Sequence, residues 1–414
     1  TNGAHVRAVK FQLELTAAER VTGFGERFEG SEFRGAEVST ILFEQYKNQG
    51  KEGKTYMPMA FAHVVGGEGW GFWIDSYRKI VFDIAKEESN LIQVTVDVDG
   101  LLGGPFPPDV HFFDGLPSEV LNAFLNRCGR PEELPEWVFG LWASGNEWNT
   151  QAEVLRQANF HRDHDIPFAN LVIEAWSDES TFTTWRDAKR TSRQSNGETK
   201  LNDFSFPKDG AWPNPKEMVD DLHSRGVKVH LWQIPLLKMR PHPKGPLAED
   251  VTEALEGDHL IAEENSAGVK KPYRNRGWWF PLGLMPDLTD PESAKWWTDK
   301  RRYLVRDLDI DGFKTDGGEH SWGRELIYKN GKRGDEMNWK FPVHYAEAYG
   351  NLLRSEGKAP VTFSRAGNVG SQAHGAFWAG DENSTWEAFR WSLNAGLTAS
   401  ASGIFYWGWD LAGF

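Results

Sequence analysis

Residues 136–414 alternate short apolar runs with helical stretches, and this alternation constrains the fold more than any other feature of the sequence. Strand–helix–strand repetition predicts a parallel sheet with right-handed crossovers. Seven strands in this length suit a (β/α)8 barrel that is truncated after its seventh strand. An open doubly wound sheet is the alternative, but no glycine-rich phosphate turn supports it. The predicted strands are 139–143, 169–174, 228–234, 312–314, 361–364, 376–379 and 403–407.

Two helices between these strands have clear sequence boundaries. A helix over 215–225 keeps its apolar residues on one face and stops before Gly226. Asp290 followed by Pro291 is typical of an N-cap and first helical position, and the helix that it opens is expected to run through Leu304.

The first part of the chain has a different character. Residues 1–125 carry β-branched and aromatic runs between Gly, Asp and Asn breakers, which predicts an antiparallel sandwich. Two prolines and two acids at 130–135 indicate a linker. We therefore expect a partial N-terminal β-sandwich domain over 1–130 and a partial (β/α)8 barrel domain over 131–414, with loop insertions at 177–212 and 236–285. Because the chain starts at Thr1 and ends directly after a strand-like run, we also expect it to be a piece of a longer protein.

Composition excludes several classes of function. The chain has 46 Lys and Arg against 60 Asp and Glu, a net charge of −14, which argues against nucleic-acid and anionic-membrane partners. A single cysteine, Cys128, excludes an intrachain disulfide and a cysteine-based zinc site, and it fits a reducing compartment such as the cytoplasm without requiring one. Twenty tryptophans favour a carbohydrate-binding cleft, although most should be core. Homo-oligomerisation stays open.

Acidic residues follow four of the predicted barrel strands. They are Glu174, Asp316, Asp381 and Asp410, after the second, fourth, sixth and seventh strands. Since the carboxyl ends of barrel strands meet at one mouth, these carboxylates should converge. A pair of carboxylates, one ionised and one protonated, is what glycosidic bond cleavage needs. The alternative for any one of them is an N-cap of the next helix.

The neighbours of two of these acids suggest separate roles. Ser384 or Thr385 can cap the helix after the sixth strand, which leaves Asp381 to act as a general acid. Asp316 is followed by two glycines that let a ligand approach the backbone, and Lys314 nearby favours its ionised form. Asp316 is therefore the better nucleophile.

Other side chains near the strand ends are candidates for sugar binding. Trp232, Trp378, Trp407 and Trp409 offer indoles for stacking, and Arg365 after the fifth strand can hydrogen-bond sugar hydroxyls or form a structural ion pair. No His or Cys cluster has the spacing of a metal site, so neither a metal nor a cofactor is expected.

Five segments, in register along the chain, match motifs of one enzyme family. They are GFGERF at 23–28, the stretch 44–58, KTDGGE within 312–319, the stretch from FSRAG at 363 to WAGD ending at 381, and GWDLAGF at 408–414. Together they resemble glycoside hydrolase family 31, which contains retaining α-glucosidases and α-xylosidases. The third resembles the family's nucleophile motif, and the fourth resembles the segment from its substrate-binding arginine to its acid/base aspartate.

The resemblance implies a function and a set of site residues. It implies a retaining, exo-acting α-glycoside hydrolase that cleaves a terminal α-linked sugar, expected to be an α-glucoside, through a covalent glycosyl-aspartate. Asp316 would be the nucleophile and Asp381 the general acid/base. The expected substrate-binding residues are Glu174, Trp232, Lys314, Glu319, Arg365, Trp378, Trp409 and Asp410.

One position departs from the family pattern. The family usually has an aspartate that grips sugar hydroxyls where this chain has Glu174, whose side chain is one methylene longer. An α-xylosidase or α-galactosidase specificity therefore stays open. An α-glycosyltransferase of the same family also stays open, because a double-displacement enzyme can pass the glycosyl group to a sugar instead of water. From other classes, a non-catalytic carbohydrate-binding barrel and a magnesium-dependent barrel enzyme are the rivals; Gln233 between the acids breaks the metal set of the latter. The expected partner is an oligosaccharide or α-glycoside.

Overall fold

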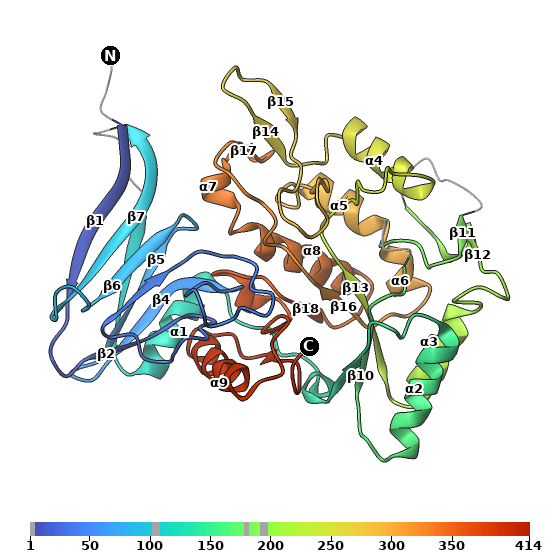
Figure 1. The fold of residues 1–414 in the computed structure, drawn as a ribbon, viewed down its shortest axis with the longest axis horizontal. Coiled ribbons are helices and arrows are strands. Elements are labelled where there is room, and N and C mark those ends of the chain that lie inside the picture. The colour runs from blue at the N-terminus through green and yellow to red at the C-terminus, as the bar shows by residue number, and fades with distance from the viewer. Residues whose placement is uncertain (1–4, 102–107, 178–181, 191–197) are drawn as a thin grey trace. The chain divides into compact units, whose positions relative to one another are not determined.

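The computed structural model describes residues 5–101, 108–177, 182–190 and 198–414, which divide into two compact units. The first unit comprises Thr1–Glu132, Asp335–Val343 and Arg365–Phe414, and the second comprises Glu133–Gly334 and His344–Ser364. Figure 1 labels the elements of both.

The first unit contains the predicted antiparallel sandwich. Its two four-stranded sheets have the orders β1-β7-β6-β3 and β2-β4-β5-β8. The Phe82 ring lies 5.0 Å from that of Phe24 and 5.8 Å from that of Phe72, so the apolar faces of the two sheets pack together. The strands are β1 (His5–Glu14), β2 (Arg20–Gly25), β3 (Ala36–Ser39), β4 (Pro58–Val65), β5 (Trp70–Asp75), β6 (Ile80–Ile84), β7 (Leu91–Leu101) and β8 (Asp109–Asp114).

Two helices of the first unit pack against this sandwich. Phe124 on α1 (Pro117–Cys128) stacks on Phe61 of β4, with ring centroids 3.8 Å apart. Thr398 on α9 (Trp386–Ala401) accepts a hydrogen bond from the Arg27 amide just after β2. The short parallel pair β19 (Ala376–Trp378) and β20 (Trp407–Gly408) belongs to the same unit. A 3-10 turn at Ser371–Ala373 precedes β19.

The second unit is built on a parallel sheet of order β18-β16-β13-β10-β9. The alternation of strands and helices along the chain predicted these parallel pairings. The elements are a 3-10 turn at Glu136–Phe139, β9 (Trp142–Ser144), α2 (Gln151–Asp163), β10 (Asn170–Ile173), α3 (Pro215–Ser224), β13 (Lys228–Gln233), α5 (Pro291–Asp299), α6 (Arg302–Arg306), β16 (Gly312–Thr315) and β18 (Thr362–Ser364). Two helices, α7 (Gly334–Met337) and α8 (Phe341–Ser355), contain residues of both units.

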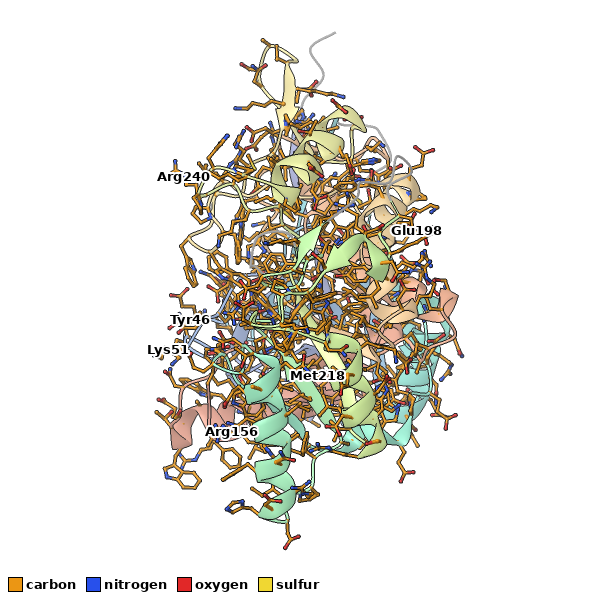
Figure 2. All side chains as sticks on the ribbon, turned by 90° about the vertical axis from the view of Figure 1, so that its right-hand side faces the viewer. Tyr46, Lys51, Arg156, Glu198, Met218 and Arg240 are labelled. Atoms are coloured by element: carbon orange, nitrogen blue, oxygen red, sulfur yellow. The ribbon has the colours of Figure 1, made fainter. Side chains whose placement is uncertain are left out.

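Helices α2 and α3 lie side by side along the sheet (Figure 1). Met218 on α3 is fully buried, whereas Arg156 on α2 is exposed, so each helix presents an apolar face inward and a charged face outward (Figure 2). The Asn214 side chain caps α3, where Pro215 occupies the first helical position.

The predictions for two elements are wrong in detail. The run 403–407 is strand only at its last residue, because α9 ends in a turn in which Gly403 has a φ of +89°. The helix expected from Asp290 through Leu304 is interrupted after Asp299, where the Arg301 amide bonds to the Thr298 carbonyl and its guanidinium turns into the interior.

Both predicted insertions carry secondary structure of their own. The first contains β11 (Lys189–Arg190), a 3-10 turn at Leu201–Asp203 and β12 (Phe204–Ser205), and part of it lies outside the described residues. The second contains α4 (Pro246–Glu256), β14 (Ala262–Glu264) and β15 (Lys270–Pro272), and its two strands join β17 (Leu326–Ile327) in an antiparallel sheet. A buried ion pair of 2.8 Å from Lys300 to Asp250 ties α4 to the α5–α6 turn. Across the described part of the chain, each helix is too short or too polar to cross a membrane.

Candidate active site

The carboxyl ends of four parallel strands in the second unit bring polar side chains to one edge of the sheet. Ser144 ends β9, Glu174 follows β10, Gln233 ends β13 and Asp316 follows β16. Because these strands are parallel and hydrogen-bonded in register, the four residues share the edge at which barrel enzymes place their active sites.

Asp316 is held in a fixed orientation at this edge. Its side chain is largely buried, at 7% exposed, and its amide bonds to the Gln233 carbonyl at 2.9 Å. Trp232 Nε1 donates to Asp316 Oδ2 at 2.9 Å, and the Gly317 amide donates to Oδ1 at 2.7 Å. An ionised carboxylate only accepts hydrogen bonds, and both oxygens here receive N–H donors.

The turn after Asp316 needs glycine for two reasons. Gly317 has a φ of +76° and Gly318 a φ of +104°, values that L side chains rarely adopt. A Cβ on Gly317 would also lie 2.8 Å from the His320 ring. The two glycines were expected to allow a close approach to the backbone, and the structure adds a packing requirement against His320.

Glu174 and Lys314 form a partly shielded ion pair at the same sheet edge as Asp316, and Lys314 lies two residues before Asp316 in the sequence. Lys314 Nζ donates to Glu174 Oε1 at 2.8 Å, and Ser144 Oγ donates to the same oxygen at 2.7 Å. Their side chains are 13% and 11% exposed. The Glu174 carboxylate is thus oriented from β9 and β16 together, which fixes where its second oxygen points.

Trp232 is positioned by aromatic neighbours and by the chain after β10. The Trp176 indole donates to the Trp232 carbonyl at 2.8 Å. The Trp232 ring meets that of Phe182 edge-on at 5.2 Å and that of Trp279 at 6.0 Å. Both neighbours come from the two insertions, so these long segments supply part of the wall around Asp316.

A buried polar network supports the strand end behind Asp316. Gln233 Oε1 accepts hydrogen bonds from Arg301 Nε at 2.7 Å and from the Tyr349 hydroxyl at 2.9 Å. Arg301 is 0% exposed and its guanidinium stacks on Trp297 at 3.8 Å. The sequence analysis missed this role of Gln233. The one feature that could have indicated it is a polar residue at the end of a buried strand.

Glu319, also expected to bind substrate, is buried next to His320. His320 Nε2 and Glu319 Oε1 are 4.0 Å apart, and the His320 carbonyl accepts a hydrogen bond from the Tyr273 hydroxyl at 2.7 Å. The segment after β16 is thereby fastened to the second insertion.

In the first unit, Asp381 follows β19 and is anchored through its backbone. The Asp381 carbonyl accepts hydrogen bonds from the Lys47 amide at 2.9 Å and from Gln49 Nε2 at 2.8 Å. The Thr385 side chain caps α9 by accepting from the Ala388 amide, which confirms the prediction that a residue other than Asp381 caps this helix.

Arg365 directly follows β18 and lies almost wholly buried in the first unit. Its guanidinium is 5.0 Å from the centre of the Tyr56 ring, and the Tyr56 hydroxyl donates to Glu44 Oε1 at 3.1 Å. Both partners come from the stretch 44–58 of the sandwich, which meets the residues around Arg365 and Asp381 within this unit.

Two buried carboxyl groups of the first unit interact with each other, and one of them, Glu382, directly follows Asp381. The sequence analysis missed both. Burial raises the pKa of Glu382 to about 8, and the nearby carboxylates of Asp410 and Glu26 raise it further. Burial also raises the pKa of Glu26 to about 7, against hydrogen bonds from Trp407 at 3.0 Å and Thr55 at 2.9 Å. At neutral pH Glu382 therefore favours its protonated form, whereas Glu26 is about half protonated.

The remaining predicted binding residues differ in exposure. Trp378 is 1% exposed and so is enclosed by protein, whereas Trp409 and Asp410 are half-buried. The Trp409 ring lies 6.0 Å from that of Trp407, and the Asp410 carbonyl accepts from the Gly413 amide at 3.0 Å. Among the described residues, no three His, Cys, Asp or Glu side chains are grouped as a metal site requires.

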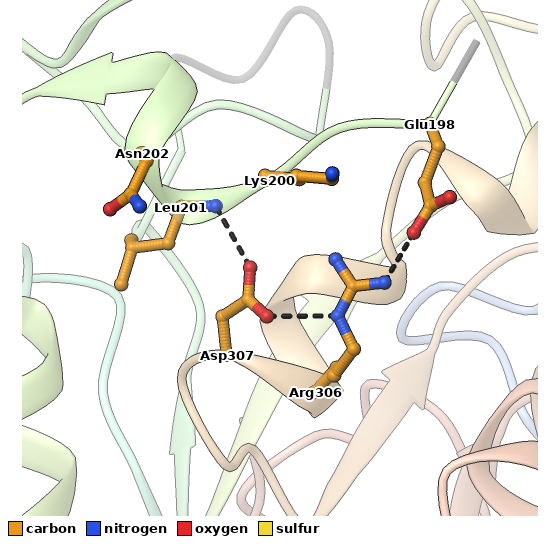
Figure 3. A pocket seen from close by; sticks show the side chains of 6 residues that line it. All are labelled: Glu198, Lys200, Leu201, Asn202, Arg306 and Asp307. Carbon is orange, nitrogen blue, oxygen red and sulfur yellow. Dashed lines mark hydrogen bonds and ion pairs between the residues drawn. The ribbon is translucent and has the colours of Figure 1, made fainter. Parts of the chain in front are cut away.

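A pocket of the second unit is unrelated to this edge of the sheet (Figure 3). Arg306 and Asp307 line it and precede β16, so they lie toward the amino ends of the parallel strands. Arg306 pairs with Glu198 and Asp307, and the Leu201 amide donates to Asp307 at 2.9 Å. Its charged lining is therefore largely neutralised by its own members.

Comparison with known proteins identifies relatives along the whole chain. Residues 131–414 match the family described as "Glycosyl hydrolases family 31 TIM-barrel domain". A 1,3-alpha-isomaltosidase of Kribbella flavida is 54% identical over 98% of this chain and 55% of its own length. An isomaltosyltransferase of Sporosarcina globispora is 38% identical over 100% of this chain and 37% of its own length. The chain thus spans about half the length, or less, of these curated relatives.

A solved structure shows the same likeness in three dimensions. The cycloalternan-degrading enzyme from Trueperella pyogenes, in complex with isomaltose, has a TM-score of 0.94 and 53% sequence identity, covering 99% of this chain and 57% of that one. The same enzyme has also been solved in complex with a covalent intermediate, with a TM-score of 0.93.

Proposed function

The chain belongs to glycoside hydrolase family 31, and from this premise we propose that it is the active-site part of a retaining, exo-acting α-glycosidase that removes isomaltosyl units. The observation that carries the proposal is the Asp316 carboxylate, buried at the carboxyl end of β16 and aimed by Trp232 and the Gly317 amide. A nucleophile needs a carboxylate held in a fixed orientation.

The proposed reaction has two displacement steps. Asp316 attacks the anomeric carbon while Asp381 gives its proton to the glycosidic oxygen, so that the C–O bond breaks and the aglycone leaves neutral. Asp381, now ionised, takes a proton from a water molecule. That water attacks the same carbon and releases Asp316, which gives net retention of configuration.

The surroundings of each acid support its assigned role. Asp316 receives N–H donors, and the Lys314 ammonium on the same strand adds positive charge to its edge of the sheet. Asp381 is followed by Glu382, a carboxyl that holds its proton near neutral pH. A carboxylate that receives N–H donors suits a nucleophile, and an acid that precedes a protonated carboxyl suits a general acid.

The isomaltosyl glycone is inferred from the relatives. The Kribbella flavida relative is named a 1,3-alpha-isomaltosidase, and the Trueperella pyogenes structure holds isomaltose. In this chain Glu174 occupies the position at which the family usually has aspartate, and it is locked by Lys314 and Ser144. A longer carboxylate with one oxygen committed to protein reaches a sugar differently from an aspartate, which fits a glycone larger than a single glucose.

Transfer to a sugar acceptor is the second candidate, because the Sporosarcina globispora relative is named an isomaltosyltransferase. A covalent glycosyl-aspartate accepts a sugar hydroxyl as readily in principle as water. Product analysis at increasing concentrations of maltose or isomaltose separates the two: a hydrolase gives isomaltose throughout, whereas a transferase gives longer oligosaccharides.

The proposal is tested by trapping the intermediate. The protein, as its gene encodes it, is incubated with 5-fluoro-α-glucosyl fluoride and with its 6-O-α-glucosyl derivative, and the labelled peptide is identified by mass spectrometry. We expect label on the Asp316 peptide, with faster labelling by the disaccharide reagent. Label on another residue would refute the nucleophile, and faster labelling by the monosaccharide reagent would refute the isomaltosyl glycone. Asp316→Asn is the control that takes no label.

A further inference from the structure

A tight loop of the second insertion, residues 277–280, carries an exposed tryptophan next to a residue that contacts Trp232. Trp278 is 68% exposed, an unusual exposure for the largest apolar side chain. Its neighbour Trp279 contacts Trp232, whose indole donates to Asp316 Oδ2 at 2.9 Å. The loop is therefore connected to the Asp316 carboxylate through Trp232, by one ring contact and one hydrogen bond.

The loop is held by one buried side chain. Asn275, 1% exposed, donates from Nδ2 to the carbonyl of Trp279 at 2.6 Å and to that of Phe280 at 3.0 Å. Its Oδ1 accepts from the Gly277 amide at 2.9 Å. A single side chain thus makes three hydrogen bonds to the backbone of a four-residue loop.

The backbone of this loop is also in a disfavoured conformation. Phe280 has a φ of +48° and Leu282 a φ of +63°, and both residues have a Cβ that disfavours the left-handed region. Backbone bonds between Asn275, Leu282 and Gly283 close the base of the loop at 2.8–2.9 Å. Strain that is held in place by a dedicated network is typical of segments that present a functional side chain.

The loop is fastened to the segment that follows the nucleophile. The Tyr273 hydroxyl donates to the His320 carbonyl at 2.7 Å, and the His320 ring lies 5.4 Å from that of Trp279. Arg276 Nη1 donates to the Trp322 carbonyl at 3.1 Å. These contacts fix the position of the loop relative to residues 320–322, which follow Asp316.

We propose that residues 277–280 form a preorganised sugar platform, on which the Trp278 indole stacks against the outer glucose ring of an isomaltosyl glycone, and that Asn275 is its positioning residue. This inference rests on the proposed function. Flat indoles bury the apolar face of a pyranose, and a rigid aromatic binds at low entropic cost.

The chemistry of displacement places the platform on the glycone side. A retaining nucleophile attacks the anomeric carbon on the face opposite the departing oxygen. Groups that adjoin Asp316 therefore surround the part of the substrate that stays on the enzyme. Trp232 bonds to Asp316 and contacts Trp279, the residue next to Trp278. We therefore assign Trp278 to the second glucose of the glycone rather than to the aglycone.

The first test compares two substrates. For Trp278→Ala, we expect kcat/KM on an aryl α-isomaltoside to fall about tenfold, the usual size when a central contact tryptophan is truncated, and that on the aryl α-glucoside to stay within about twofold. Phe139→Ala is the matched control, because Phe139 is an exposed aromatic at the amino end of β9. It should change neither value.

The second test separates positioning from folding. Asn275→Asp keeps the side-chain volume but replaces both Nδ2 donors by an acceptor, so the loop loses two of its bonds. We expect the same selective loss on the isomaltoside. The thermal midpoint should fall, because two carbonyls beside a buried carboxyl lose their donor, and a rate on the aryl glucoside within about twofold of wild type shows that the active site is still folded. Trp278→Phe, which keeps a flat ring, should retain most of the wild-type preference.

Each contrary outcome has a distinct meaning. Equal losses on both substrates overturn the platform and leave the proposed function intact. A loss that grows with the length of the aglycone, at constant isomaltoside preference, places Trp278 on the other side of the scissile bond and also overturns the proposal. Wild-type protein without any isomaltoside preference overturns the proposed function together with the platform.

Discussion

The two candidate catalytic acids occupy surroundings of opposite character. Around Asp316, in the second unit, lie the N–H donors of Trp232 and Gly317 and, at the same sheet edge, the Lys314 ammonium. In the first unit, Asp381 is followed by the buried carboxyl of Glu382, whose pKa burial raises to about 8. One acid lies among N–H donors and the other precedes a carboxyl that keeps its proton at neutral pH, and this contrast suits the different roles that we propose for them.

Removing the nucleophile should have the largest effect on activity. Asp316→Ala is expected to lower kcat/KM about ten-thousand-fold or more, because no other group at this edge receives the same two N–H bonds. Azide should then enter the vacated space and form a β-glycosyl azide from an α-glycosyl fluoride. Product analysis by NMR checks this, and an α-azide, or no loss of rate, would contradict the role of Asp316.

Removing Asp381, the proposed general acid, should slow substrates with poor leaving groups far more than substrates with good ones. Asp381→Ala is expected to slow natural glycosides about a hundred- to ten-thousand-fold, since they need a proton on the leaving oxygen. Glycosyl fluorides and activated aryl glycosides need little protonation and should lose far less. Measured kcat/KM values for both substrate types give the comparison, and equal losses would remove Asp381 from the acid role.

The contrast between the two units also predicts a pH-dependent stability. The pKa values of Glu382 and Glu26 are raised in the folded state to about 8 and about 7. Their protonated forms therefore contribute to the free energy of unfolding at acid pH, and this contribution is lost as the pH rises through these values. The fall begins above the ordinary glutamate pKa of 4.5 and levels off above about pH 8, and from about pH 5 upward the two groups together give at most about 7 kcal/mol.

The matching variant is Glu382→Gln, which mimics the protonated side chain and keeps an oxygen that can accept the hydrogen bond from the Ser392 hydroxyl. Its unfolding free energy in urea should equal that of the wild type near pH 5 and exceed it near pH 9. Glu87→Gln, at an exposed position, is the control and should follow the wild type throughout. Parallel curves for Glu382→Gln and wild type would mean that this carboxyl does not titrate on unfolding.

The sequence located the acids better than it located their partners. Asp316 follows an apolar strand and precedes two glycines, and Thr385 precedes an amphipathic helix, so local pattern suffices for both. The bond from Trp232 to Asp316 spans 84 residues and the pair of Lys314 with Glu174 spans 140. Such contacts depend on strand order and register, which no local pattern encodes.

The same reason explains what was missed entirely. Arg301 looks like an ordinary helical residue in the sequence, yet it interrupts the α5–α6 run to reach Gln233 in the interior. Glu382 looks like a solvated acid next to Asp381, and only the packing of the first unit makes it a buried carboxyl. Burial of a polar group is a tertiary property, so these residues were visible only in the structure.

The smallest predicted effect is that of Glu174, which lies at the same sheet edge as Asp316. Glu174→Asp shortens the side chain by one methylene, so its carboxylate cannot keep both the 2.8 Å bond to Lys314 and the 2.7 Å bond to Ser144. We expect kcat/KM on an aryl α-isomaltoside to fall about tenfold, the cost of one charged hydrogen bond. The ratio of glucoside to isomaltoside cleavage should rise, because the shorter carboxylate is the one that the family uses for sugar hydroxyls.

Ser144→Ala, which removes one bond and keeps the ion pair, should show a smaller change of the same sign. If Glu174→Asp instead lowered both substrates equally, Glu174 would serve only to hold Lys314 near the nucleophile, and the choice of glycone would rest on other residues of this sheet edge.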